Sequence, residues 1–169
     1  GMEHGAFWQP PLWFYCAAPV IAIFGYDIIP LRLFSVALGL LIIWATFVYA
    51  RRLGLSTWVS RVGVLFLALN PNFVTYVKLA RMDGLCALLT ILGLIFYVRF
   101  CTDGKKSSLA AAGSLFGLAT LTHPLGLIGA ICTALHVATS REERKTALRL
   151  LSWIVVPVAV AVGIWVFSA

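Results

Sequence analysis

Charged side chains are scarce in this sequence. Asp, Glu, Lys and Arg make up 11% of its 169 residues, whereas an ordinary soluble domain carries about 25%. So few polar groups cannot cover the surface of a water-soluble fold. The 62% of apolar residues also excludes a disordered chain, which needs low hydrophobicity and high charge. Together with a mean hydropathy of +0.98, this composition indicates an integral membrane protein.

Acidic residues are the scarcest charged type. Six of them stand against 13 Lys and Arg, which gives a formal net charge of +7. A basic excess is typical of proteins that bind nucleic acids, but in membrane proteins it arises from Lys and Arg on cytoplasmic loops. The positions of these residues along the chain decide between the two.

Cysteine pairs and a secretory leader are also missing. The four cysteines (Cys16, Cys86, Cys101 and Cys132) have no CxxC or metal-ligand spacing, which excludes a disulfide framework and a zinc site. We expect buried thiols and assign no metal ligand. The first residues lack the basic region and the apolar region of a signal peptide, so we expect none here. Because it starts at Gly1 with loop-like residues, we expect the chain to be part of a longer protein.

Long apolar runs, in contrast, are abundant. A spanning helix needs about 20 apolar residues, and the runs at 31–50, 59–79, 84–101 and 147–169 are of about this length. Residues 107–139 form either one kinked helix or two short ones that meet at Thr122-His123-Pro124. Two helices place ten basic residues on the cytoplasmic side and three outside, whereas one helix gives six against seven. The positive-inside rule and Pro124 therefore favour two helices, and the basic residues report topology rather than nucleic-acid binding.

The aromatic segment 11–25 is too short to span a bilayer. It contains Trp13 and Tyr15, which favour the membrane interface, so we interpret it as an interfacial helix on the external face, bent near Pro19. The expected fold is an all-α, polytopic transmembrane bundle that forms one domain over residues 1–169. Residues 1–30 form an external loop with the interfacial helix, and residues 31–169 form about six spanning helices.

Two further patterns predict details of the helices. Asn70-Pro71 lies inside the second span and predicts a kink. Gly113 and Gly117 have the GxxxG spacing that lets two helices approach closely.

This topology collects ionisable residues at the external boundary, where charges are costly and often functional. They are Glu3, His4, Asp27, Arg32, Lys78, Arg81, Asp83 and His123. Such a rim suits an amphipathic, anionic substrate. His136 lies near the cytoplasmic end, and we expect a structural role for it.

Lys78, Arg81 and Asp83 share one short external hairpin. Arg binds phosphate through two parallel hydrogen bonds and Lys acts as a point charge, while a carboxylate can accept the proton of a nucleophile. The alternative is structural: Asp83 stands where a helix N-cap belongs, and Lys and Arg commonly close a helix C-terminus. His123 either binds an acceptor or phosphate, or satisfies loop carbonyls.

Several motifs follow one another in a characteristic order. They are Trp8-Gln9-Pro10-Pro11-Leu12-Trp13-Phe14-Tyr15, Leu31-Arg32-Leu33-Phe34-Ser35, Ala50-Arg51-Arg52-Leu53-Gly54 and Ala80-Arg81-Met82-Asp83. Over about residues 5–127 this order resembles glycosyltransferase family 39, the protein O-mannosyltransferases and the bacterial ArnT-like lipid A aminoarabinose transferases. The resemblance implies a multi-spanning GT-C enzyme whose donor is a sugar linked to polyprenyl phosphate.

The resemblance also implies roles for single residues. Arg81 and Asp83 match the family's Arg-x-Asp pattern, Gln9 stands where the proline-rich external segment usually has Lys, and His123 replaces a cation in a later break. The expected site therefore has Asp83 as catalytic residue and Arg81, Lys78, His123 and Gln9 as substrate-binding residues. The family's first acidic motif, Asp-Glu, has no counterpart here and would lie upstream.

The implied reaction is an inverting sugar transfer to a protein, lipid or glycan acceptor at the external face of a membrane, expected to be the bacterial inner membrane. Without the Asp-Glu motif, this chain alone is expected to be inactive. Its partners are the lipid-linked donor, the acceptor and membrane lipids, with no nucleic acid; we assign no cofactor beyond the donor and leave a divalent metal open.

One alternative is a non-enzymatic bundle such as a transporter fragment or an assembly subunit, although transporters place ionisable groups near the midplane. A polytopic phosphatase is the other, although no Cys or Ser nucleophile with a basic partner is visible.

Overall fold

The computed structural model describes residues 10–139 and 144–168, and every regular element in these two stretches is helical. The predicted all-α fold is therefore confirmed for this part of the chain. The elements are α1 (Leu12–Phe24), α2 (Ile28–Arg52), α3 (Thr57–Leu69), α4 (Pro71–Lys78), α5 (Asp83–Asp103), α6 (Lys106–Thr120), the short 3₁₀ helix η1 (Pro124–Gly126), α7 (Leu127–Thr139) and α8 (Arg144–Ser168).

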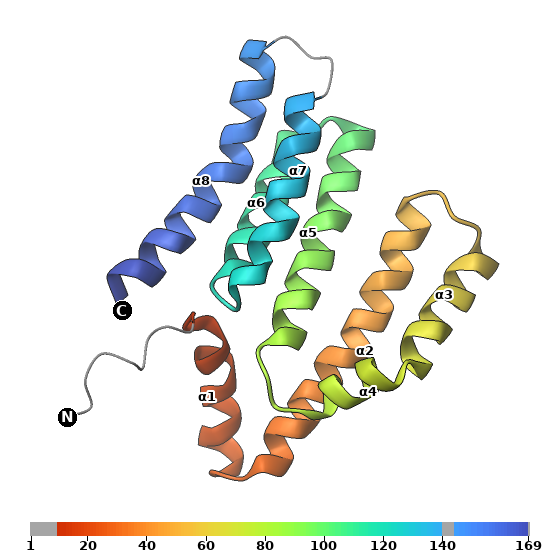
Figure 1. The fold of residues 1–169 in the computed structure, drawn as a ribbon, viewed down its shortest axis with the longest axis vertical. Coiled ribbons are helices and arrows are strands. Elements are labelled where there is room, and N and C mark those ends of the chain that lie inside the picture. Colours follow the sequence, from red (N-terminus) through yellow and green to blue (C-terminus); the bar gives the residue numbers. More distant parts are fainter. Residues whose placement is uncertain (1–9, 140–143, 169) are drawn as a thin grey trace.

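Helices α2 and α5 pack side by side at the centre, with α3 and α4 beyond α2 and the group α6–α8 beyond α5 (Figure 1). Both central helices are long and apolar enough to cross a membrane. The Asp27 carboxylate caps α2 by accepting the N–H of Ile29 at 3.1 Å. At the C-terminal end of α5, Gly104 ends the helix with a φ of 66°, a backbone conformation that glycine adopts without steric cost.

The apolar helices α1, α3 and α7 are shorter than a bilayer-spanning helix needs to be. Helix α8 has 25 residues, but the apolar stretch described within it is Leu150–Val166. The count of about six spans therefore stays a prediction, although α2 and α5 extend the predicted runs 31–50 and 84–101 by only one to three residues at each end.

The predicted kink in the second span is a break between two helices. α3 ends at Leu69, and the side-chain oxygen of Asn70 accepts the N–H of Phe73 at 3.1 Å to cap α4. Pro71 is the first residue of α4, where its missing N–H costs no helix hydrogen bond.

The predicted break between α6 and α7 is confirmed as well. α6 ends at Thr120, and the chain re-enters helical structure at Pro124. The Thr122 hydroxyl donates to the Leu118 carbonyl at 2.9 Å, and the His123 N–H donates to the Ala119 carbonyl at 2.9 Å. These bonds satisfy the turn internally and hold the His123 backbone against the end of α6.

Close packing at glycines joins α5, α6, α7 and α8. A Cβ on Gly113 would lie 2.2 Å from the Trp153 carbonyl oxygen of α8, so α6 and α8 meet through their backbones at the predicted GxxxG pair. Phe116 is fully buried, and a Cβ on Gly93 of α5 or Gly129 of α7 would lie 2.6 or 2.8 Å from its ring. The Phe116 ring therefore fills the space where α5 and α7 lack side chains.

Helix α1 lies at the end of the bundle where the α4–α5 connection runs (Figure 1). The Leu12 N–H donates to the Leu121 carbonyl at 2.9 Å, and the Trp13 ring centroid lies 5.8 Å from that of Phe34 on α2. This placement agrees with an interfacial helix, while its position relative to a bilayer stays a prediction.

The cysteines follow the prediction only in part. None of the four, which all lie in the described stretches, forms a disulfide, and Cys86 is buried. Cys101 and Cys132 are exposed, so the expectation of buried thiols is wrong for these two. A thiol behaves as a small apolar group and can also lie on the outer surface of a membrane helix.

Candidate functional site

The connection between α4 and α5 brings Arg81 and Asp83 together. The Arg81 N–H bonds to the Leu79 carbonyl at 2.8 Å, which folds the connection into a tight turn. The Arg81 Nε then lies 2.7 Å from Asp83 Oδ2, with the two side chains 52% and 38% exposed. The pair is therefore formed and still open to a ligand.

The structure does not support the simple capping interpretation of Asp83. The N-cap of α5 is Met82, which makes no side-chain cap bond, and Asp83 is the first residue of the helix. Its charge favours the positive end of the helix dipole, but its carboxylate bonds to Arg81 rather than to an orphan backbone N–H.

Tyr76 is part of this site and was not anticipated from the sequence. The Arg81 guanidinium carbon lies 6.0 Å from the centroid of the Tyr76 ring, at the limit of a cation–π contact. The sequence offers one weak indication, because Tyr76 stands two residues before Lys78 in a segment expected at the membrane interface. Many aromatic residues of membrane proteins share such a position, so it does not single out Tyr76.

His123 reaches Asp83 from the turn between α6 and α7. Its Nδ1 accepts the Leu125 N–H at 3.1 Å, which caps η1. A nitrogen that accepts carries no proton, so the proton of the neutral ring is on Nε2. Nε2 lies 4.0 Å from Asp83 Oδ1, the carboxylate oxygen that Arg81 does not hold.

Asp83 and His123 stand at the polar end of a groove of about 360 Å³. Below them the groove is almost entirely apolar, with Cys86, Ala87 and Ile91 from α5 and Leu125 and Ile128 from the η1–α7 segment. Thr90 also lines it, but its hydroxyl donates to the Cys86 carbonyl at 2.9 Å and so is already satisfied. The site thus combines a charged head with an apolar trough.

The other predicted site residues lie elsewhere. Lys78 ends α4 and lines a different groove, between α2 and α4. Gln9 lies outside the described residues, as do Glu3 and His4. Asp27 is the cap of α2. His136 has a structural contact, because its Nδ1 bonds to the Tyr97 hydroxyl and the two rings pack edge to face, with centroids 5.8 Å apart.

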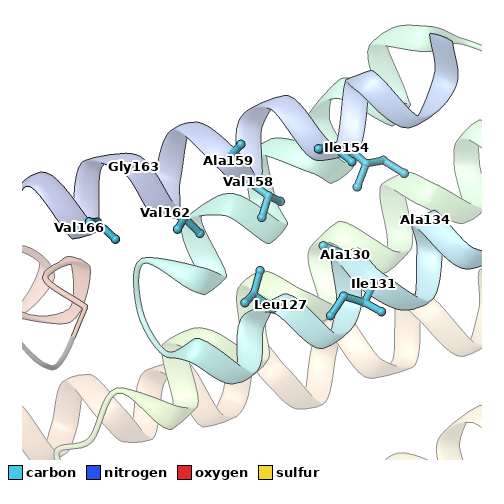
Figure 2. Close-up of a pocket in the computed structure, with 11 residues that line it drawn as sticks. Leu127, Ala130, Ile131, Ala134, Ile154, Val158, Ala159, Val162, Gly163 and Val166 are labelled. Carbon is cyan, nitrogen blue, oxygen red and sulfur yellow. The ribbon is translucent and has the colours of Figure 1, made fainter. Parts of the chain in front are cut away.

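A further groove, of about 510 Å³, lies between α7 and α8 (Figure 2). Every residue that lines it is apolar, including Ala130, Ile131, Val158 and Val162. It therefore offers no group for acid–base or phosphate chemistry. Within residues 10–139 and 144–168, no three His, Cys, Asp or Glu side chains cluster in a way that could hold a metal ion.

Comparison with known families shows which family the chain belongs to. The profile of the dolichyl-phosphate-mannose-protein mannosyltransferase family matches residues 8–168. The chain belongs to this family. The match covers nearly the whole chain and confirms the resemblance seen in the order of the motifs. Membership of this family indicates a membrane glycosyltransferase. Searches against curated proteins and against solved structures found no match.

Proposed function

We propose that this chain forms the donor-binding part of a membrane glycosyltransferase that takes its sugar from a polyprenyl-phosphate carrier. The observation that supports it is the convergence of Arg81, Asp83 and His123 at the head of an apolar groove. A lipid-linked sugar has the same division, with a charged phosphate and sugar at one end and a hydrocarbon chain at the other. The mannosyltransferase family supplies the reaction class.

Arg81 and His123 are the phosphate-binding residues in this proposal. The Arg81 guanidinium keeps donors beyond the single Nε bond that Asp83 occupies, and the His123 Nε2–H faces the same carboxylate. As the bond between sugar and phosphate breaks, negative charge grows on the phosphate leaving group. Fixed donors at that position lower the barrier because they stabilise this charge.

Asp83 acts on the acceptor side. In the described part of the chain, its Oδ1 has no hydrogen-bond donor closer than the His123 Nε2 at 4.0 Å, so a hydroxyl of an incoming acceptor can donate to it. Asp83 then either takes the proton or orients the carboxylate that does. The family's Asp-Glu motif, absent from this chain, is proposed as the leading base, with Asp83 as its partner at the external membrane face.

The test is Asp83→Asn in the full-length enzyme, because amide replacement keeps the shape and removes the charge. Loss of one acid–base group costs about 10²–10⁴-fold in rate. Sugar transfer from a radiolabelled polyprenyl-phosphate donor to acceptor is measured in proteoliposomes, together with the thermal unfolding midpoint.

The matched control is Asp103→Asn. Asp103 lies on the same helix and also pairs with an arginine, Arg99, at 3.3 Å, but at the opposite end of α5. The control is expected to retain wild-type transfer. Wild-type turnover in Asp83→Asn, or equal losses in both variants, would remove Asp83 from the reaction and leave it a role in the stability of the α4–α5 turn.

A further inference from the structure

A second groove runs between α2 and α4, separate from the one headed by Asp83. Its volume is about 180 Å³, half the 360 Å³ of the Asp83 groove. Apolar residues of α2 and α4 line it together with Ala68 of α3, and Lys78 is the one charged residue in the lining.

The groove exists because α4 is held close to α2 near Lys78. A Cβ on Gly39 would lie 2.4 Å from a Val77 methyl carbon, so only glycine admits Val77 at this point. At the other end of α4, the break at Asn70 turns the chain from α3 into α4. The shallow channel therefore follows the contact between two helices, with Lys78 at the end near the α4–α5 connection.

Arg32 is not one of the lining residues, but it lies on the face of α2 that forms this groove. Val36, Gly39 and Ile43 line the groove and follow Arg32 at spacings of four, seven and eleven residues. These spacings place all four residues on one face of α2, with Arg32 one turn nearer the helix start. The α1–α2 and α4–α5 connections lie at the same end of the bundle (Figure 1).

Both cations lack an acidic partner in the described part of the chain. Arg81 and Arg99 are paired with Asp83 and Asp103, whereas no described carboxylate lies within 4.0 Å of Arg32 or Lys78. The nearby acid Asp27 is used as the cap of α2. Two exposed, unpaired cations thus stand above an apolar channel.

We infer that this groove binds an anionic phospholipid of the surrounding bilayer. The phosphate lies between Arg32 and Lys78, where guanidinium and ammonium are complementary to it, and an acyl chain follows the apolar lining. Among residues 10–139 and 144–168, no carboxylate lies within 4.0 Å of either cation, so the proposed site holds a lipid without acid–base chemistry. Lys78 is thereby assigned to a structural lipid rather than to the sugar donor.

Native mass spectrometry of the purified protein tests this site. Phosphatidylglycerol and phosphatidylcholine with identical acyl chains are added, and the retained lipid is counted. The wild type is expected to retain phosphatidylglycerol about tenfold more strongly, because the quaternary ammonium of phosphatidylcholine offsets the charge of its phosphate and is repelled by the two cations. The double variant Arg32→Gln/Lys78→Gln is expected to lose this preference, and Arg32→Lys/Lys78→Arg to keep it.

Two controls separate the site from general charge effects. Arg51→Gln/Arg52→Gln removes two exposed cations from the other end of α2 and is expected to leave the preference unchanged. Ala68→Phe keeps both cations but places a ring in the groove, so it is expected to reduce retention of phosphatidylglycerol even if the double glutamine variant does not fold.

Two results would overturn the inference. One is an unchanged preference for phosphatidylglycerol in Arg32→Gln/Lys78→Gln. The other is displacement of phosphatidylglycerol by polyprenyl phosphate in the wild type, which would make the groove part of the donor site. Neither readout depends on sugar transfer, so both are independent of the role of Asp83.

Discussion

The imidazole of His123 faces the carboxylate of Asp83, with 4.0 Å between Nε2 and Oδ1. The two residues come from different helical segments, and each is held by a second contact. Arg81 fixes one oxygen of Asp83 at 2.7 Å, and the Leu125 N–H fixes the far nitrogen of His123 at 3.1 Å. The remaining oxygen and nitrogen therefore face each other at a separation that a ligand atom can bridge.

This arrangement predicts different effects for two substitutions of His123. Asn keeps a side-chain acceptor for the Leu125 N–H but removes the group that faces Asp83, so His123→Asn is expected to fold normally and raise the donor KM about tenfold. His123→Leu loses both contacts and is expected also to lower stability by about 1 kcal/mol. Transfer kinetics and thermal unfolding separate the two effects. A wild-type KM in His123→Asn would exclude His123 from donor binding.

The backbone contact between α6 and α8 predicts a strong effect of a single methyl group. Gly113→Ala places a Cβ 2.2 Å from the Trp153 carbonyl oxygen, and overpacking of this kind costs about 1–3 kcal/mol. Gly63→Ala on α3 meets nothing within 4 Å and is expected to be neutral or stabilising by up to about 1 kcal/mol. Unfolding in a mixed-detergent titration measures both. Equal stabilities would show that α6 and α8 are not in contact.

Asn70 is predicted to stabilise the start of α4 through its side chain. Asn70→Ala removes the acceptor of the Phe73 N–H and is expected to cost about 1 kcal/mol, while Asn70→Asp retains the cap. Asn72→Ala is the control, because Asn72 is exposed on the same helix and makes no cap. Stability is read from thermal unfolding. A loss of similar size in Asn72→Ala would assign the effect to helix propensity instead of capping.

The bond between Tyr97 and His136 predicts energetic coupling between α5 and α7. In a double-mutant cycle, Tyr97→Phe and His136→Leu are expected to couple by about 0.6 kcal/mol, as side-chain hydrogen bonds inside membrane proteins do. The same cycle with Leu135→Ala, a 60% exposed neighbour, is expected to give no coupling. Equal coupling in both cycles would mean that the hydrogen bond contributes nothing specific.

Local chemistry explains which parts were predictable from the sequence. The breaks at Asn70 and Thr122–Pro124 depend on capping and proline effects within a few residues, and both were predicted. The pairing of Arg81 with Asp83 follows from a tight turn. The sequence placed His123 and Asp83 at the same boundary, but their approach depends on how η1 packs against α5 and was not predicted.

The features that were missed depend on the direction of each helix face. Lys78 and Asp83 lie in one hairpin, yet Lys78 ends a helix whose packing against α2 directs it to another groove. His136 has the structural contact expected of it, but its partner Tyr97 could not be identified because it lies on a different helix. Cys101 and Cys132 are exposed, because in a lipid-facing helix apolarity does not distinguish the inside from the outside.

The Phe116 ring has a consequence for how any guest reaches Asp83. Gly93 of α5 and Gly129 of α7 both pack directly against this ring, so α5 and α7 are in close contact with α6 at that depth. Separating the helices there would leave a cavity around Phe116, which is fully buried. Such a void costs several kcal/mol. A guest therefore reaches Asp83 along the open side of the groove, where Leu125 and Ile128 are 61% and 55% exposed, and not by separating α5 from α7 at the depth of Phe116.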